Sequence, residues 1–96
     1  MLKIKDNVDL KELAKFGFAY HEDKNFGNRW FYQSKSGGYI IIYEEDAVTP
    51  YGDYLVYPKR TLLLMANINC IEDKLLKQMC KILVKEDLVE KVDEEQ

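Results

Sequence analysis

The stretch that decides the fold is RWFYQSKSGGYIIIYEE, from Arg29 to Glu45. Arg29 to Lys35 is rich in aromatic residues and Tyr39 to Glu45 in isoleucine and tyrosine, side chains that favour β-strands. Gly37 and Gly38 lie between these runs, and both glycines can adopt positive φ without a Cβ penalty. The stretch therefore predicts a β-hairpin with a tight connection at Gly37-Gly38.

The segments on either side of this hairpin extend the predicted sheet. Phe18 to Glu22 reads as a strand that precedes the hairpin across a polar loop. Asp46 to Asp53 has the composition of a turn and leads into a strand at Tyr54 to Tyr57. Beyond Pro58, the run Thr61 to Ala66 favours a further strand. The start of a helix is the alternative for this run, because leucine, methionine and alanine also favour helices.

The N-terminal segment predicts a short strand followed by a short helix. Leu2 and Ile4 share one side of the strand. Asp9 is a suitable helix N-cap, and Glu12 three residues later completes the capping-box pattern. Gly17 supplies the left-handed residue that ends the helix. A helix of this length does not persist alone in water, so it is expected to dock on the sheet.

The C-terminal segment has the clearest helical pattern. Asn69 is a suitable cap, and apolar residues recur at helical spacing from Ile71 to Leu83, opposite a face rich in lysine. The helix is expected to end near Lys85, with a short closing strand at Leu88-Val89 and Val92. The alternative is a helix that continues to Val92, which would place acidic residues at its C-terminal end, where the macrodipole disfavours them.

The length of 96 residues, of which 47 % are apolar, indicates one domain, since so short a chain cannot divide its apolar residues between two cores. A domain of this size buries about 65 % of the surface of its unfolded chain. The predicted fold class is α+β: an antiparallel β-meander of four to five strands packed on the C-terminal helix, with the short N-terminal helix alongside. Residues 1–92 are predicted to form this domain and residues 93–96 an acidic, frayed tail.

The net charge is −3, and the acidic residues are concentrated at the C-terminal end, where Lys91 is the only base after Glu86. An acidic chain without a basic stripe disfavours direct binding of DNA or RNA. No secretory signal and no membrane helix are expected, because the apolar runs are far shorter than the roughly 20 residues that span a bilayer. A cytoplasmic location is therefore expected, with Cys70 and Cys80 both reduced.

Two segments, one near each end of the sequence, resemble segments of known small proteins. The first is Ile4 to Leu13 followed by Phe16-Gly17-Phe18, and the second is Asp73 to Leu83 followed by Asp87 to Val92. Together they cover about a third of the chain. Both resemble segments of small uncharacterised proteins encoded by phages and prophages of Gram-positive bacteria. The resemblance implies an accessory phage gene product, and it carries over no catalytic residue.

Residues that often carry chemistry are few and isolated in this sequence. His21 is the only histidine, and a lone strand histidine is more often a surface residue than a general base. Cys70 lies in the first turn of the predicted helix, but without a histidine partner it is expected to be a small buried hydrophobe. Glu44-Glu45-Asp46 is expected to be a solvated loop edge rather than a cation site. No cofactor, no metal site and no enzymatic activity are predicted.

Every aromatic residue lies between Phe16 and Tyr57. Alternation places Trp30 and Tyr32 on the face of a strand opposite to Phe31, and apolar residues occupy both faces of the next strand as well. Two helices can cover one face of the sheet, so the other is expected to be partly exposed, as in protein interaction surfaces. The candidate interaction surface consists of Trp30, Tyr32, Tyr51 and Tyr54. The alternative is that these large side chains fill the core while tyrosine hydroxyls reach water.

These observations predict a non-enzymatic accessory protein of phage type that acts by protein–protein interaction. Its expected partner is a host or phage protein, and inhibition of a host defence protein is one form of this activity. The alternative is a protein that binds or sequesters a small ligand or nucleotide by aromatic stacking around Trp30, Tyr51 and Tyr54. A homodimer formed through the exposed face is a further alternative.

Overall fold

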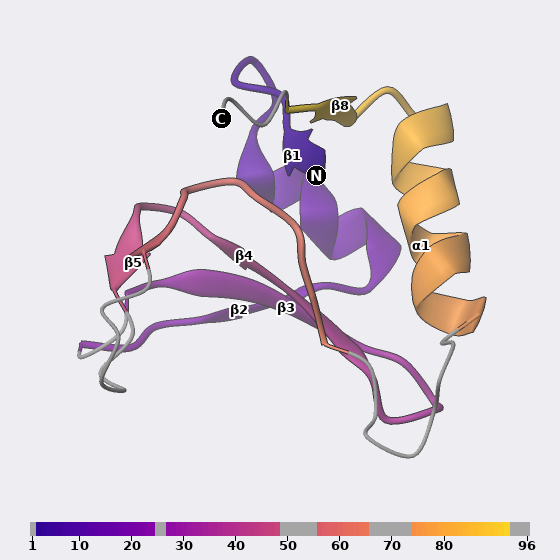
Figure 1. The fold of residues 1–96 in the computed structure, drawn as a ribbon, viewed down its shortest axis with the longest axis horizontal. Helices are drawn as coiled ribbons and strands as arrows, with labels where there is room; N and C mark the ends of the chain where they lie inside the picture. The colour runs from indigo at the N-terminus through magenta and orange to yellow at the C-terminus, as the bar shows by residue number, and fades with distance from the viewer. Residues whose placement is uncertain (1, 25–26, 49–55, 66–73, 93–96) are drawn as a thin grey trace.

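The computed structural model describes residues 2–24, 27–48, 56–65 and 74–92. The fold is α+β, with a four-stranded antiparallel sheet, two smaller strand pairs, a short 3-10 helix near the N-terminus and a C-terminal α-helix (Figure 1). Both helices lie on the same side of the four-stranded sheet (Figure 1). The predicted fold class is confirmed.

The four-stranded sheet is built around the predicted hairpin. Its strands, in spatial order, are β2 (Ala19–His21), β3 (Arg29–Gln33), β4 (Tyr39–Tyr43) and β7 (Leu63–Met65). Every neighbouring pair is antiparallel. The run after Pro58 therefore forms a strand, and the alternative of a helix there is wrong. Because leucine and methionine favour helices in isolation, it is pairing with β4 that makes this run a strand.

The connection between β3 and β4 is longer than a two-residue turn at Gly37-Gly38, so that prediction is wrong. The Gly37 N–H donates to the Ser34 carbonyl at 3.1 Å, and the Ser34 N–H donates to the Gly38 carbonyl at 2.8 Å. Lys35 and Ser36 are thus the central residues of the turn. Of the two glycines only Gly37 has positive φ, at 92°. A turn followed by one left-handed glycine forms a bulge that keeps the twist of the strands.

A second hairpin interrupts the meander between β4 and β7. Its strands are β5 (Ala47–Val48) and β6 (Val56–Tyr57), which pair antiparallel. The first of them falls in the segment predicted as a turn, because two residues are too few to show an alternation pattern. The second confirms the end of the strand predicted at Tyr54 to Tyr57, whose first two residues lie outside the described part of the chain.

The two ends of the described chain pair with each other. β1 (Leu2–Ile4) is antiparallel to β8 (Val89–Lys91), which confirms both terminal strands. Lys3 also forms an antiparallel bridge to Thr61, just before β7. The terminal pair is therefore joined to the edge of the four-stranded sheet.

η1 (Leu10–Phe16) forms where a short helix is predicted, but it is a 3-10 helix. Asp9 caps its start by accepting a hydrogen bond from a backbone N–H of the first turn, and Gly17 ends it with φ of 92°. The Glu12 carboxylate pairs with Lys15 at 2.8 Å. The predicted cap and end are confirmed, although the tighter helix type was not expected.

α1 (Lys74–Lys85) ends where the sequence predicts, and its expected cap at Asn69 lies outside the described residues. Its buried residues are Leu76, Met79 and Leu83. Asp87 follows the helix with a positive φ of 62°. The alternative of a helix that continues to Val92 is wrong, because the left-handed residue turns the chain into β8.

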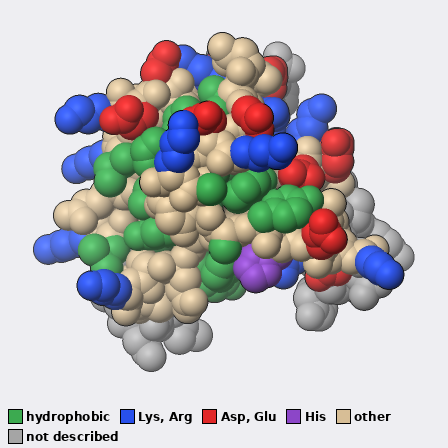
Figure 2. Space-filling view, turned by 180° about the vertical axis from the view of Figure 1, so that it is seen from behind, with side chains coloured by type: hydrophobic (Ala, Val, Ile, Leu, Met, Phe, Trp, Pro, Cys, Tyr) green, Lys and Arg blue, Asp and Glu red, His purple; other side chains and the backbone are tan. Residues whose placement is uncertain are grey.

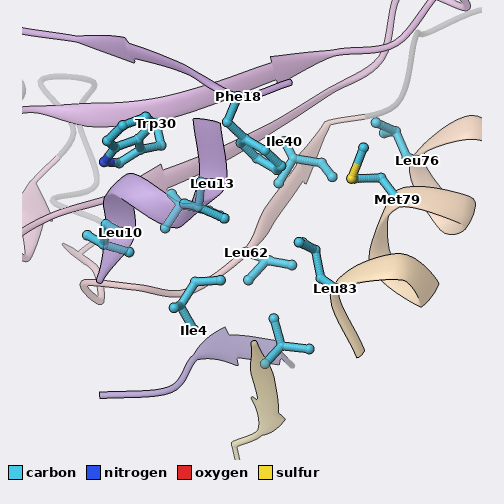
Figure 3. Packing of buried hydrophobic residues seen from close by; sticks show 12 residues of the cluster. Ile4, Leu10, Leu13, Phe18, Trp30, Ile40, Leu62, Leu76, Met79 and Leu83 are labelled. Carbon is cyan, nitrogen blue, oxygen red and sulfur yellow. The ribbon is translucent and has the colours of Figure 1, made fainter. Parts of the chain in front are cut away.

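The core lies between the sheet and the helices (Figure 3). Its fully buried side chains come from the terminal strand, both helices and β4: Ile4, Leu13, Ile40, Ile42 and Leu83. Among the described residues, no helix is both long and apolar enough to span a bilayer.

Candidate functional site

The two sides of the four-stranded sheet differ in what lies on them. Strand register pairs Trp30 with Ile42 and Tyr32 with Ile40, so these four side chains point to one side. The two isoleucines are fully buried and Trp30 is 7 % exposed. Residues of η1 and α1 pack on this side (Figure 3). We call it the covered face.

No helix packs on the other side of the sheet in the described part of the chain (Figure 1), and we call this side the open face. The open face comprises Ala19, His21, Arg29, Phe31, Gln33, Tyr39, Ile41, Leu63 and Met65. Phe31, Ile41 and Leu63 form one row across three strands, and all three are partly exposed. The rings of Phe31 and Tyr39 pack with centroids 5.3 Å apart. The open face is thus a continuous apolar and aromatic surface.

The β5–β6 hairpin closes one end of the open face. Tyr43 points to the same side as Arg29, its cross-strand partner, but is only 8 % exposed. The ring of Tyr57 stacks on it nearly parallel, with centroids 6.1 Å apart. The accessible part of the open face therefore begins beyond Tyr43.

The residues predicted as the interaction surface do not lie on the open face. Trp30 belongs to the core, and Tyr32 packs against it with its ring 5.4 Å from that of Phe18, although Tyr32 is partly exposed, as Phe31 is. Tyr51 and Tyr54 lie outside the described residues. That one face of the sheet is partly exposed stays a prediction for the whole chain. Burial contradicts the assignment of Trp30 to such a face, and Tyr32 lies on the side where η1 and α1 pack but is itself partly exposed.

The sequence did not single out Phe31 and Ile41, which alternate with the buried residues along β3 and β4 and point to the opposite side of the sheet. Phe31 and Ile41 are as apolar as their neighbours, so periodicity separates the two sets without showing which one faces water. A charged residue could have distinguished the two sides of the strand. Arg29 lies two residues before Phe31, so both side chains point to the same side of β3. A charged residue is seldom fully buried without a partner, so its side of the strand is the better candidate for the exposed face.

His21 and Arg29 stand at the β2 end of the open face and are cross-strand partners. The His21 ring is exposed and meets the Phe31 ring edge-on, with centroids 5.7 Å apart. Figure 2 shows this histidine, in purple, at the surface beside hydrophobic side chains. Arg29 pairs with Asp23 at 3.6 Å, and both side chains are about three-quarters buried. His21, Arg29 and Phe31 line an open pocket of about 140 Å³.

The acidic residues after β4 act as hydrogen-bond acceptors within the fold. Glu44 accepts a hydrogen bond from the Tyr20 hydroxyl at 3.2 Å, and Asp46 accepts one from the Lys59 N–H at 2.8 Å. Partial desolvation, together with the negative charge of Glu44, raises the pKa of the Tyr20 phenol. In the described part of the chain, no three His, Cys, Asp or Glu side chains are placed to hold a metal ion.

The cysteines offer no activated thiol among the described residues. Cys80 packs against the core from α1, and burial raises the pKa of its thiol. A higher pKa leaves less thiolate, the reactive form, at neutral pH. Cys70, which the sequence singles out as the more reactive position, lies outside the described residues.

One polar atom of the covered face stands out. The indole N–H of Trp30 is buried and finds no hydrogen-bond acceptor in the described part of the chain. Such a group costs about 1–3 kcal/mol of desolvation free energy. Its position in the core, between the sheet and Leu10, places it away from the open face (Figure 3).

Comparison of the chain with protein-family models, with curated proteins and with solved structures found no match. The candidate site therefore rests on the geometry of the open face.

Proposed function

We propose that this protein acts by binding a partner protein on the open face of its sheet, without catalysing a reaction. The observation that carries the proposal is the row of Phe31, Ile41 and Leu63, which is partly exposed and on which no helix of the described residues packs. The opposite face packs against two helices and leaves only its edge residues Tyr20 and Leu64 exposed among the described strands. The largest contiguous apolar patch on a soluble protein is often a functional surface, and it commonly marks a site of protein–protein interaction.

The electrostatics of the open face favour an apolar partner surface. Apart from Arg29, the open face holds no Lys, Arg, Asp or Glu side chain, and the charge of Arg29 is balanced by Asp23. The core of a protein interface is likewise depleted in charge and enriched in aromatic residues and arginine. A nucleic acid is disfavoured as the partner, because its phosphates require an excess of positive charge.

The size of the open face favours a short segment of another protein over a second copy of this chain. Two strands of five residues and two of three, at about 3.4 Å per residue and about 4.8 Å spacing, give a footprint on the order of 250 Å². A stable interface buries about 800 Å² on each partner. Two copies laid face to face would fall short of this area, whereas an amphipathic segment of a partner can lie across the strands with its apolar side down.

The small-ligand alternative has less support from the described residues. The pocket lined by His21, Arg29 and Phe31 has about 140 Å³, whereas pockets that enclose small molecules have about 300–1,000 Å³. A nucleotide would not fit inside it. The pocket is the right size for a single group of a larger partner.

The experiment uses two neighbouring leucines of β7 as a matched pair. Leu63 lies on the open face, whereas Leu64 points to the other side of the sheet and is 50 % exposed. Leu63→Lys is expected to lower the amount of partner captured from a bacterial lysate about tenfold, because it places a charge in an apolar contact. Leu64→Lys is expected to capture as much as the native chain.

The resemblance to phage-encoded proteins makes a host protein of a Gram-positive bacterium the first partner to test, including proteins of its defence systems. Equal capture by both lysine variants would overturn the proposal, and so would a native chain that retains nothing above background. Light scattering is expected to show a monomer. A dimer that Leu63→Lys dissociates would replace the partner protein with a second copy.

A further inference from the structure

In the described part of the open face, a hollow lies over β2 and β3 near His21 and Arg29. Its lining residues are His21, Arg29 and Phe31. Strand register places them together, because His21 is the cross-strand partner of Arg29 and Phe31 follows Arg29 on the same side of β3. Ala19 is the cross-strand partner of Phe31, so a larger side chain at this position would come to lie beside the Phe31 ring.

The volume of the hollow matches one aromatic ring. A cavity of about 150 Å³ in a protein core accommodates benzene, and this hollow has about 140 Å³. It is too large for a single water molecule, whose share of liquid volume is about 30 Å³. It is too small for a fused ring system with a sugar and phosphate.

The walls of the hollow are suited to a ring. Phe31 already makes an edge-on contact with His21 at 5.7 Å and a tilted contact with Tyr39 at 5.3 Å, the offset geometries that aromatic pairs prefer. Arg29 adds a guanidinium, the group that most often packs on aromatic faces. Because Asp23 lies 3.6 Å from Arg29, the local charge is balanced. An isolated anion would therefore gain less here than a neutral ring.

We propose that this hollow is a subsite that takes one aromatic side chain, phenylalanine or tyrosine, from the partner segment bound on the open face. This inference deepens the proposed function and rests on it for the source of the ring. The subsite would set where along the sheet the segment lies, since the hollow is confined to the β2 end. The row of Phe31, Ile41 and Leu63 would then contact the apolar residues of the partner segment that come after its aromatic residue.

The first test uses three capped amino acids as probes: N-acetyl-phenylalanine amide, N-acetyl-leucine amide and N-acetyl-aspartate amide. Their binding is followed by backbone amide chemical shifts of the isotope-labelled full chain. The phenylalanine probe is expected to shift Arg29 and Phe31 saturably, with a Kd in the millimolar range. The leucine and aspartate probes are expected to bind roughly three- to tenfold more weakly.

The matched variants enlarge the cross-strand partner of Phe31 or leave the open face unchanged. Ala19→Leu adds a side chain beside Phe31 and is expected to abolish the shifts. Ala14→Leu makes the same change at an exposed position of η1 and is expected to preserve them. Equal binding of the leucine probe, or undiminished binding by Ala19→Leu, would overturn the subsite.

The subsite and the docking proposal can fail separately. If Leu63→Lys abolishes partner capture while the phenylalanine probe does not bind, the docking face stands and the subsite is wrong. If the probe binds at Phe31 while Leu63→Lys captures as much partner as the native chain, the pocket takes a ring but the open face is not where the partner docks.

Discussion

The covered face and the open face of the sheet are made of the same kinds of residue, yet only one of them is core. β4 shows the contrast in three consecutive isoleucines: Ile40 and Ile42 are fully buried, whereas Ile41 between them is partly exposed. The difference comes from η1 and α1, which pack on one side. Apolar character therefore identifies the strand, but a covering element decides which of its faces stabilises the fold and which is left for binding.

The largest expected effect comes from comparing two neighbouring isoleucines of β4, one on the covered face and one on the open face. Ile40→Ala should lower the free energy of unfolding by about 3 kcal/mol, because it opens a cavity in the core. Ile41→Ala should cost about 1 kcal/mol, because part of its side chain already contacts water. Denaturant unfolding followed by the fluorescence of Trp30, the only tryptophan, measures both. Equal losses would mean that the open face is as well packed as the covered one.

A smaller effect is expected where η1 is held over the covered face. Gly17 has φ of 92° and ends η1, so Gly17→Ala should cost about 1–2 kcal/mol of stability. The added Cβ would lie 3.7 Å from the Tyr32 ring, an ordinary contact, so the cost is backbone strain.

Gly27 provides the control for this strain. It has nearly the same φ, 91°, and a Cβ there would meet nothing within 4 Å. Gly27→Ala should cost less than Gly17→Ala in thermal unfolding, because Gly27 lies outside the helices. If the two substitutions cost the same, the end of η1 contributes nothing specific to covering the sheet.

The smallest expected effect concerns the end of α1. Asp87 occupies the left-handed position that Gly17 occupies after η1, and the Leu88 N–H donates to the Leu83 carbonyl at 3.0 Å. Asp87→Gly should stabilise the fold by about 0.5–1 kcal/mol, because glycine adopts positive φ without a steric cost. The substitution also removes the ion pair between Lys5 and Asp87. This pair contributes little to stability, because the Asp87 side chain is largely exposed to water.

Asp87→Asn separates these two contributions, since asparagine tolerates the left-handed conformation but cannot pair with Lys5 as an ion. Its thermal unfolding midpoint should lie close to that of the native chain. A loss of stability in both variants would show that the ion pair outweighs the backbone strain.

Much of the fold could be predicted because its signals are local. The hairpin around Gly37, the helix end at Gly17 and the end of α1 at Lys85 each follow from a few neighbouring residues. The turn at Lys35 and Ser36 could not, because a bulge competes with a tight turn for the same glycines. The strand at Ala47–Val48 could not either, because it exists only through pairing with β6.

For the candidate site, the sequence predicted only that one face of the sheet is partly exposed, without showing which face. The excess of apolar residues over what two helices can cover pointed to an exposed face, and in the described part of the chain no helix packs on one side of the sheet. The choice of Trp30 for that face was wrong, because Trp30 is buried and both possible faces carry large apolar side chains. Nothing within β3 itself distinguishes the side that η1 will cover.

The sequence by itself determined the central hairpin, the two terminal strands and the ends of both helices, since alternation, caps and left-handed residues act over a few neighbours. Only the tertiary structure decided on which face of the sheet the helices pack, that the run after Pro58 is a strand, that β1 pairs with β8, and that His21, Arg29 and Phe31 line one hollow. These outcomes depend on contacts between residues far apart in the chain. Their free energy comes from burying surface jointly, so no single segment encodes them.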